Sequence, residues 1–211
     1  LAVTEGVEQR LAGTVFADPA FLARLDVVFA DLYFEALDAY QRDPASSPHA
    51  WRPLFAERSR RGIAPLQFAF AGMNAHINRD LPVALVATCT ALGLELTMGS
   101  PQHQDYERVN GLLATVETQI KQQYLTGWLH TVDRLLHRVS RIDDVAAMWG
   151  IERAREAAWI NAQALWVLRH DAALSADFVA TLDRTVGFAG RGLLIPADTW
   201  LRRLARFLHL G

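Results

Sequence analysis

The sequence predicts an all-α protein, a single-domain helical bundle over residues 1–211 with a central apolar helix that is kinked or broken. Three observations lead to this prediction. Apolar residues recur at the three- and four-residue spacing of a helix in most segments. No segment alternates between apolar and polar residues as a half-buried strand does, and no internal repeat is found. The connections between the periodic segments are short, which favours one domain.

The first strong helix signal is Asp18-Pro19, because Asp is a preferred N-cap and proline fits the first helical position. The predicted buried face of this helix contains Phe21, Leu25, Val28, Leu32, Ala36 and Tyr40. The segment 43–48, rich in proline and serine, is the clearest loop, and Gly62 ends a short helix at 51–60. Further helices are predicted at 4–16, 65–92, 101–119, 122–139, 140–149, 152–169, 176–188 and 196–208, with a loop at 93–101 and a turn at Gly187, Gly190 and Gly192.

The composition excludes several classes of protein. Apolar residues make up 51% of the chain, too many for a disordered protein, and their runs are shorter than the ~20 residues of a membrane span. The net charge of −2 gives no basic field for nucleic acid. Cys89 is the only cysteine, so no intrachain disulfide can form, which fits a cytoplasmic protein. The chain begins at Leu1 without Met, which is compatible with removal of a leader. We expect a small-molecule substrate, and a homo-oligomer is compatible with the sequence.

The best site candidate is the segment 72–82, which carries two Asn, a His, an Arg and an Asp. Strongly apolar runs at 66–71 and 83–91 flank it, so both flanks are predicted to be core. Burying a polar group unpaired costs roughly 1–3 kcal/mol, so polar groups held inside a core must pair or bind something. Pro82 either kinks the helix at this segment or begins a second helix.

His76 and Asp80 are four residues apart, so on a continuous helix their side chains share one face. An imidazole and a carboxylate at this spacing can form an acid–base dyad or chelate one cation. Asn74 and Asn78 have the same spacing on a neighbouring face and are candidate substrate-binding residues. The alternative is that Asp80 caps a helix beginning near Pro82, while His76 bonds a nearby backbone group.

Weaker candidates lie in two other segments. His103 and Asp105 are two residues apart near a predicted helix start. If both side chains point toward the core there, they are further candidate metal ligands. Asn110 in the same helix is a candidate substrate-binding residue. Glu35 is a further candidate metal ligand beside an apolar face. Asp31 lies four residues before it, so the two carboxylates repel each other on a helix, and a bound cation would relieve that repulsion. The simpler interpretations are that Asp105 is a helix cap while His103 faces solvent, and that the acidic residues around Asp31 form a solvated face.

A stripe at steps of three and four contains Glu156, Trp159, Gln163, Trp166 and His170. A carboxylate beside indoles can have a raised pKa and act as a general acid, which makes Glu156 a catalytic candidate. Indole faces suit apolar or cationic ligands, so Trp159, Gln163 and Trp166 are candidate substrate contacts. The alternative is a core or interface stripe in which Glu156 pairs with an arginine.

Several segments resemble an uncharacterised, mainly actinobacterial, all-helical family of unknown function (domain of unknown function 5995). The similar segments are VFADLYFEAL at 28–37, NAHINRDLP within 72–82, DYERVN at 105–110 and REAAW at 155–159. Together they span most of the chain, and NAHINRDLP is fairly specific. The resemblance implies a helical fold and a site around His76 and Asp80, and it supplies no established reaction.

A weaker, local likeness is to the zinc-dependent phospholipase C and P1 nuclease group, which binds zinc with HxxxD on a helix followed by a proline. His76, Asp80 and Pro82 look like that piece alone. The likeness implies a divalent metal such as zinc. The further His residues of that group's three-metal site have no clear counterparts here.

Three hypotheses for function follow. The first is a small bacterial enzyme with a buried site at His76 and Asp80, with or without a divalent metal, acting as a hydrolase or lyase on a small organic or lipid-like substrate. The second is a metal-free cyclase or isomerase of secondary metabolism, in which Glu156 or Asp80 is the acid and Trp159 and Trp166 shape an apolar pocket. The third is a non-catalytic helical binding protein. No GxGxxG, P-loop, HExxH, CxxC or GxSxG motif narrows the choice.

Overall fold

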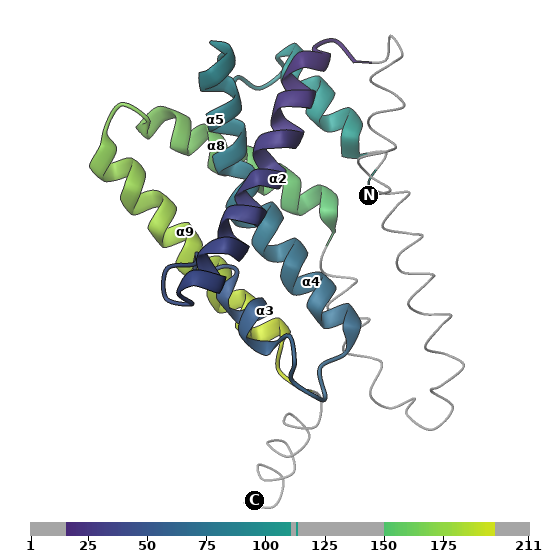
Figure 1. The fold of residues 1–211 in the computed structure, drawn as a ribbon. Helices are drawn as coiled ribbons and strands as arrows, with labels where there is room; N and C mark the ends of the chain where they lie inside the picture. The colour runs from purple at the N-terminus through teal and green to yellow at the C-terminus, as the bar shows by residue number, and fades with distance from the viewer. Residues whose placement is uncertain (1–15, 111–112, 114–149, 197–211) are drawn as a thin grey trace, which may run out of the picture.

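The computed structural model describes residues 16–110, 113 and 150–196, and every regular element in these ranges is helical (Figure 1). The elements are α2 (Pro19–Arg42), α3 (Arg52–Glu57), α4 (Pro65–Ala75), the π-helical turn η1 (His76–Asp80), α5 (Leu81–Leu92), a helix at 101–110, α8 (Ile151–Leu168) and α9 (Ala172–Leu193). The all-α prediction is confirmed. Among the described helices, none is long and apolar enough to cross a membrane. Apart from Phe16 and Pro196, the helices predicted at 4–16, 122–139, 140–149 and 196–208 fall outside the described residues, as do positions 111, 112 and 114–119 of the helix predicted at 101–119.

α2 begins where the sequence predicts. Asp18 is its N-cap, and the carboxylate accepts a hydrogen bond from the N–H of Phe21 at 3.0 Å. Pro19 occupies the first helical position, where no backbone N–H is needed. Phe21, Leu25 and Ala36 are buried, as their helical spacing predicts.

The central segment runs as α4, η1 and α5 without leaving the helical region. The predicted interruption takes the form of η1, a single π-helical turn that ends two residues before Pro82. Pro82 lies in the first turn of α5. A π-helical turn adds a residue to the helix repeat, and such turns often occur at functional sites.

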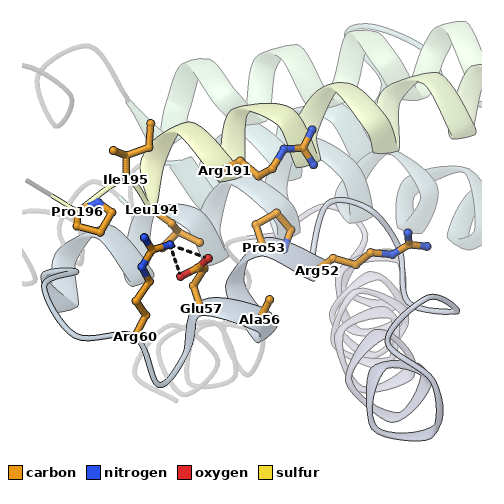
Figure 2. Close-up of a pocket in the computed structure, with 9 residues that line it drawn as sticks. All are labelled: Arg52, Pro53, Ala56, Glu57, Arg60, Arg191, Leu194, Ile195 and Pro196. Carbon is orange, nitrogen blue, oxygen red and sulfur yellow. Dashed lines mark hydrogen bonds and ion pairs between the residues drawn. The ribbon is translucent and has the colours of Figure 1, made fainter. Parts of the chain in front are cut away.

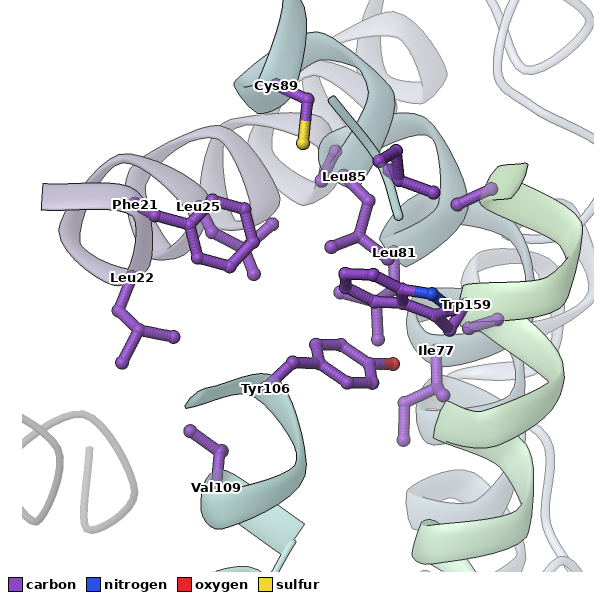
Figure 3. Close-up of a cluster of buried hydrophobic side chains, with 14 of the residues drawn as sticks. Phe21, Leu22, Leu25, Ile77, Leu81, Leu85, Cys89, Tyr106, Val109 and Trp159 are labelled. Carbon is purple, nitrogen blue, oxygen red and sulfur yellow. The ribbon is translucent and has the colours of Figure 1, made fainter. Parts of the chain in front are cut away.

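Helices on opposite sides bury the central segment. α5 packs against α2 and α8, and α4 packs against α9. Figure 3 shows the larger hydrophobic cluster, in which side chains of α2, η1, α5, α8 and the helix at 101–110 meet. Its members include Phe21, Leu22, Leu25, Ile77, Leu81, Leu85, Cys89, Tyr106, Val109 and Trp159. η1 itself contacts α2, α8 and α9, so its polar residues are surrounded by helices from both ends of the chain.

α9 is longer than predicted and contains all three glycines that the sequence analysis assigns to a turn. Asp171 caps its start by accepting hydrogen bonds from two backbone N–H groups, and the helix continues to Leu193. The prediction of a turn at Gly187, Gly190 and Gly192 is wrong. At Gly187 the missing side chain lets α9 approach the backbone at positions 49 and 50, where an added Cβ would collide. A glycine can thus serve close packing inside a helix as well as a turn.

The loop between α2 and α3 is fixed by hydrogen bonds. Ser47 is buried and donates to the carbonyl of Ala36 at 3.0 Å, and Arg52 donates through Nε to the carbonyl of Ser47 at 2.6 Å. α3 is shorter than the predicted 51–60. These bonds hold Trp51, which directly precedes α3, and the backbone at positions 49 and 50 in place.

Candidate active site

η1 brings the side chains of His76 and Asp80 into contact. The N–H of Leu81 donates to the carbonyl of His76, five residues earlier, and closes the π-helical turn. His76 Nδ1 lies 3.0 Å from Asp80 Oδ2. Asp80 does occupy the N-cap position of α5, which begins next to Pro82, but its side chain makes no capping hydrogen bond there and turns to His76 instead.

The carboxylate of Asp80 is completely buried and bonds three side chains. Trp51 Nε1 donates to Oδ2 at 2.9 Å, the same oxygen that His76 contacts. Arg79 donates through Nη1 to the other oxygen at 2.8 Å. An isolated buried carboxylate would cost several kcal/mol, so these donors are what allow Asp80 to lie in the core. They also fix its orientation toward His76.

His76 is held between this carboxylate and an aromatic wall. Its ring stacks on Phe29 of α2 with a centroid separation of 3.5 Å and an interplanar angle of 6°. Tyr33 and Trp51 lie edge-on or tilted to it, at 6.4 Å and 5.8 Å. Because a carboxylate only accepts, the bond to Asp80 requires the proton on Nδ1, and neutral His76 then presents Nε2 as an acceptor. The side chain is 27% exposed, so solvent reaches it.

Arg79 extends the network to α9. Its Nε is buried 3.7 Å from Asp183 Oδ1, an ion pair too long for a hydrogen bond. The Asp183 carboxylate also accepts from the backbone N–H groups of His49 at 2.8 Å and Ala50 at 3.0 Å. Asp183 thereby ties α9 to the loop that carries Trp51, and both carboxylates that face Arg79 are held in place.

A pocket of about 590 Å³ lies beside Arg79. Its walls include the charged side chains of Arg79, Arg169 and Asp183. The small residues of α9 that leave space for it are Ala172, Ser175, Ala176 and Ala180. The volume falls within the range of about 300–1,000 Å³ that is typical of small-molecule sites.

Asn74 and Asn78, the predicted substrate-binding amides, bond to protein groups. Asn74 is buried and donates to the carbonyl of Val186 in α9 at 3.0 Å. Asn78 donates to the side-chain oxygen of Asn74 at 3.1 Å. Their positions support a role in docking α9 against α4 and η1.

The donor set around Asp80 does not fit a divalent metal. Among the described residues, no group of three or more His, Cys, Asp or Glu side chains lies close enough to hold an ion. Both oxygens of Asp80 already face donor hydrogens, and one donor is the positive guanidinium of Arg79, which repels a cation. A carboxylate that binds metal must present its lone pairs to the ion.

The other predicted metal ligands are engaged elsewhere. Asp105 is buried and accepts from the backbone N–H groups of residues 17 and 18 and from Arg108, so it anchors the start of α2. His103 accepts from the N–H of Gly99 at 3.3 Å, and its Nε2 lies 3.8 Å from Glu107. Glu35 is exposed to solvent. The structure does not bring these residues to the His76–Asp80 pair.

The tryptophan stripe of α8 is divided between the core and the surface. Trp159 is 1% exposed and packs between Tyr106 and His103. Trp166 is also buried and donates to Glu95 at 3.0 Å, and Gln163 is half-buried. Glu156 is exposed, so it is not a buried acid beside the indoles. The predicted stripe is mainly a packing face, which is the simpler of the two interpretations.

Asn110, another predicted substrate contact, lies in a buried cluster around an arginine. Arg155 donates to the side-chain oxygen of Asn110 and to the carbonyl of Tyr106 at 3.0 Å, and its guanidinium stacks on the Tyr106 ring. Burial lowers the pKa of Arg155, whereas the neighbouring Tyr106 and Glu107 act in the opposite direction. This cluster joins α8 to the helix at 101–110.

Three residues of the site are missed by the sequence analysis as site residues: Trp51, Asp183 and Phe29. In the sequence they lie 25, 103 and 47 positions from the nearer of His76 and Asp80, and no periodic pattern relates them to this pair. Arg79 is adjacent to Asp80 in the segment 72–82, so the sequence alone indicates that it lies near the site.

Comparisons with known proteins place the chain in a family. The model of a family of unknown function (DUF5995) matches residues 1–196, so the chain belongs to this family. No curated protein and no solved structure matches the chain. The resemblance that the segments of the sequence suggest is thus confirmed at the level of the family.

Proposed function

We propose that this member of the family is an enzyme in which His76 is the general base and Asp80 orients it. One observation carries the proposal. A completely buried carboxylate, held by Trp51 and Arg79, meets Nδ1 of a histidine whose side chain is still 27% exposed. Carboxylate–imidazole pairs of this kind fix the tautomer of the base and stabilise its protonated form.

In the proposed step, Nε2 of His76 takes a proton from a water molecule or from a substrate carbon or hydroxyl. The imidazolium that forms keeps its Nδ1 proton directed at Asp80, whose negative charge stabilises it. Trp51 and Arg79 hold the carboxylate still during this change. Proton abstraction from water is the first step of a hydrolase, and abstraction from carbon is the first step of a lyase.

The surroundings of His76 favour a small organic substrate. Phe29 and Tyr33 form an aromatic wall beside the imidazole and provide an apolar surface next to the base. The pocket beside Arg79 has the size of a small-molecule site, and it lies on the α9 side of the network, with Arg79 and Asp183 but not His76 in its lining. The cyclase alternative has less support, because Glu156 is exposed and Trp159 is packed in the core.

The protonation geometry of His76 can be tested without knowing the substrate. Nitrogen-15 NMR of histidine-labelled protein should show the Nδ1–H tautomer for His76 in the neutral form. Diethyl pyrocarbonate, which acylates an accessible unprotonated ring nitrogen, should modify His76 in the folded protein. An Nε2–H tautomer, or a His76 that stays unmodified until the protein unfolds, would rule out the proposed base.

Activity is tested on a panel of p-nitrophenyl acetate, p-nitrophenyl butyrate and bis(p-nitrophenyl) phosphate. On any ester that the wild type hydrolyses, His76→Gln and Asp80→Asn should each lower the rate by about 10²–10⁴-fold, the usual contribution of a general base. His170→Gln is the matched control, because His170 is an exposed histidine in the turn just after α8. A rate that falls only in proportion to the folded fraction would instead assign the pair a structural role.

A further inference from the structure

A second pocket, of about 450 Å³, lies between α3 and the end of α9 (Figure 2). One side is formed by α3 and the residues just after it, and the other by the last turn of α9 and the residues that follow. Its size also falls within the range of about 300–1,000 Å³ for small-molecule sites. The lining residues are distinct from those of the pocket beside Arg79.

The charged side chains of this second pocket are predominantly positive. Arg52, Arg60 and Arg191 line it, opposed by the single carboxylate of Glu57. Walls of one charge sign around a low-dielectric hollow concentrate ligands of the opposite charge. The pocket therefore attracts an anion.

Two of the three arginines have donors to spare. Arg60 uses one nitrogen, Nη1, for both oxygens of Glu57 at 3.0 Å, and it makes no further hydrogen bond with the described residues. Arg191 contacts the ring of Phe188, with its guanidinium carbon 5.7 Å from the ring centroid, and makes no hydrogen bond with the described residues. Arg52 is committed, since it donates to carbonyls of the preceding loop. It adds fixed positive charge to the site.

The floor of this second pocket is apolar. Pro53, Leu194 and Pro196 are buried, and Ile195 is half-buried. Figure 2 shows the side chain of Leu194 next to that of Arg60 and the side chain of Pro53 below that of Arg191. A ligand that satisfies both features carries an oxyanion for the guanidinium forks and an apolar body for the floor.

We propose that this second pocket binds a small amphipathic carboxylate, with its head group on Arg60 and Arg191 and its apolar chain on Leu194 and the prolines. The ligand carboxylate takes the donors of Arg60 that Glu57 does not use. Glu57 competes with the ligand for Arg60 and repels it. This site is independent of the His76–Asp80 pair, and its test requires no enzymatic activity.

The test uses the full chain and three probes: hexanoate, acetate and hexylammonium. Hexanoate binding, followed by isothermal calorimetry and by amide chemical shifts, should perturb residues of α3 and the end of α9. Acetate lacks the apolar body and hexylammonium lacks the anion, so both should bind at least tenfold more weakly. Equal binding of acetate would reduce the pocket to a general anion site and overturn the proposal. Equal binding of hexylammonium would show that the pocket binds apolar chains without selecting an anion, which would also overturn the proposal.

Four variants assign the contacts. Arg60→Gln and Arg191→Gln should each weaken hexanoate by about 10-fold or more, because hydrogen bonds to charged groups contribute about 1.5–3 kcal/mol. Glu57→Gln should tighten binding, because it removes the competing carboxylate. Arg184→Gln is the control, since Arg184 is an exposed arginine of α9 outside the lining. Thermal melting checks that the variants fold. Unchanged affinity in both arginine variants, or weaker binding in Glu57→Gln, would overturn the proposal.

Discussion

The close approach of α9 to the loop before α3 makes Gly187→Ala the most informative single substitution. A Cβ at position 187 would lie 2.7 Å from the carbonyl carbon of His49 and closer still to its oxygen, and 3.2 Å from the nitrogen of Ala50. All three atoms belong to the backbone, so no side chain can rotate away to make room. α9 and the loop must move apart.

The change in the free energy of unfolding on Gly187→Ala has contributions of opposite sign. In a helix, alanine is more favourable than glycine by about 0.8–1.0 kcal/mol. Overpacking costs about 1–3 kcal/mol, and the same displacement weakens the hydrogen bonds from His49 and Ala50 to Asp183, each worth about 1.5–3 kcal/mol. We expect Gly187→Ala to lower the free energy of unfolding by about 3–5 kcal/mol, as the overpacking and lost bonds outweigh the helix gain.

Urea unfolding followed by circular dichroism measures this difference. Gly192→Ala is the matched control in the same helix, because a Cβ there meets no atom within 4 Å. That variant should leave the free energy of unfolding unchanged or raise it by up to about 1 kcal/mol. If Gly187→Ala proved as stable as Gly192→Ala, α9 would not contact the loop as described, and the position of Asp183 beside Arg79 would lose its support.

Three further substitutions test the buried polar groups and the thiol. Asp80→Ala leaves the donors of Trp51, His76 and Arg79 without this buried acceptor and should cost about 3–5 kcal/mol in urea unfolding, whereas the exposed Asp31→Ala should change stability by less than about 0.5 kcal/mol. Asp105→Ala removes the acceptor of two backbone N–H groups before α2, so hydrogen exchange in the first turn of α2 should accelerate while that in α9 stays unchanged. Burial of the thiol raises the pKa of Cys89 from 9.0 to about 11, and two nearby carboxylates contribute less to this rise. The folded protein therefore holds this proton more tightly than the unfolded chain, and stability should fall between about pH 9 and pH 11. Cys89→Ala should make this fall shallower and leave the contribution of Tyr106, whose pKa burial also raises.

Local features of the fold follow from the sequence because their causes are local. Asp18 accepts a hydrogen bond from one free N–H of the helix start, and Pro19 has no N–H to satisfy, so these two residues predict the beginning of α2. The same holds for Gly93, whose left-handed conformation ends α5 at the predicted loop. Periodic burial along α2 follows from the helical repeat alone.

The glycines of α9 show where this reasoning fails. A glycine permits both a positive φ and a close contact, and only the partner surface decides which of the two is used. Gly187 faces the backbone of His49, which lies 138 positions earlier in the chain. No pattern within α9 contains that information. The same is true of Asp183, because its position in the sequence of α9 does not distinguish it from the exposed polar residues of that helix.

The His76–Asp80 pair lies between these two cases. Four-residue spacing is enough to predict that the side chains can meet, and chance produces the same spacing often. What distinguishes this pair is the burial of the carboxylate, and burial is only tolerable because Trp51 and Arg79 supply donors to both oxygens. Trp51 is placed by the loop that Asp183 holds through His49 and Ala50. The orientation of the proposed base therefore depends on contacts that reach from α2 to α9, so substitutions on α9 that spare every residue touching His76 should still alter its tautomer.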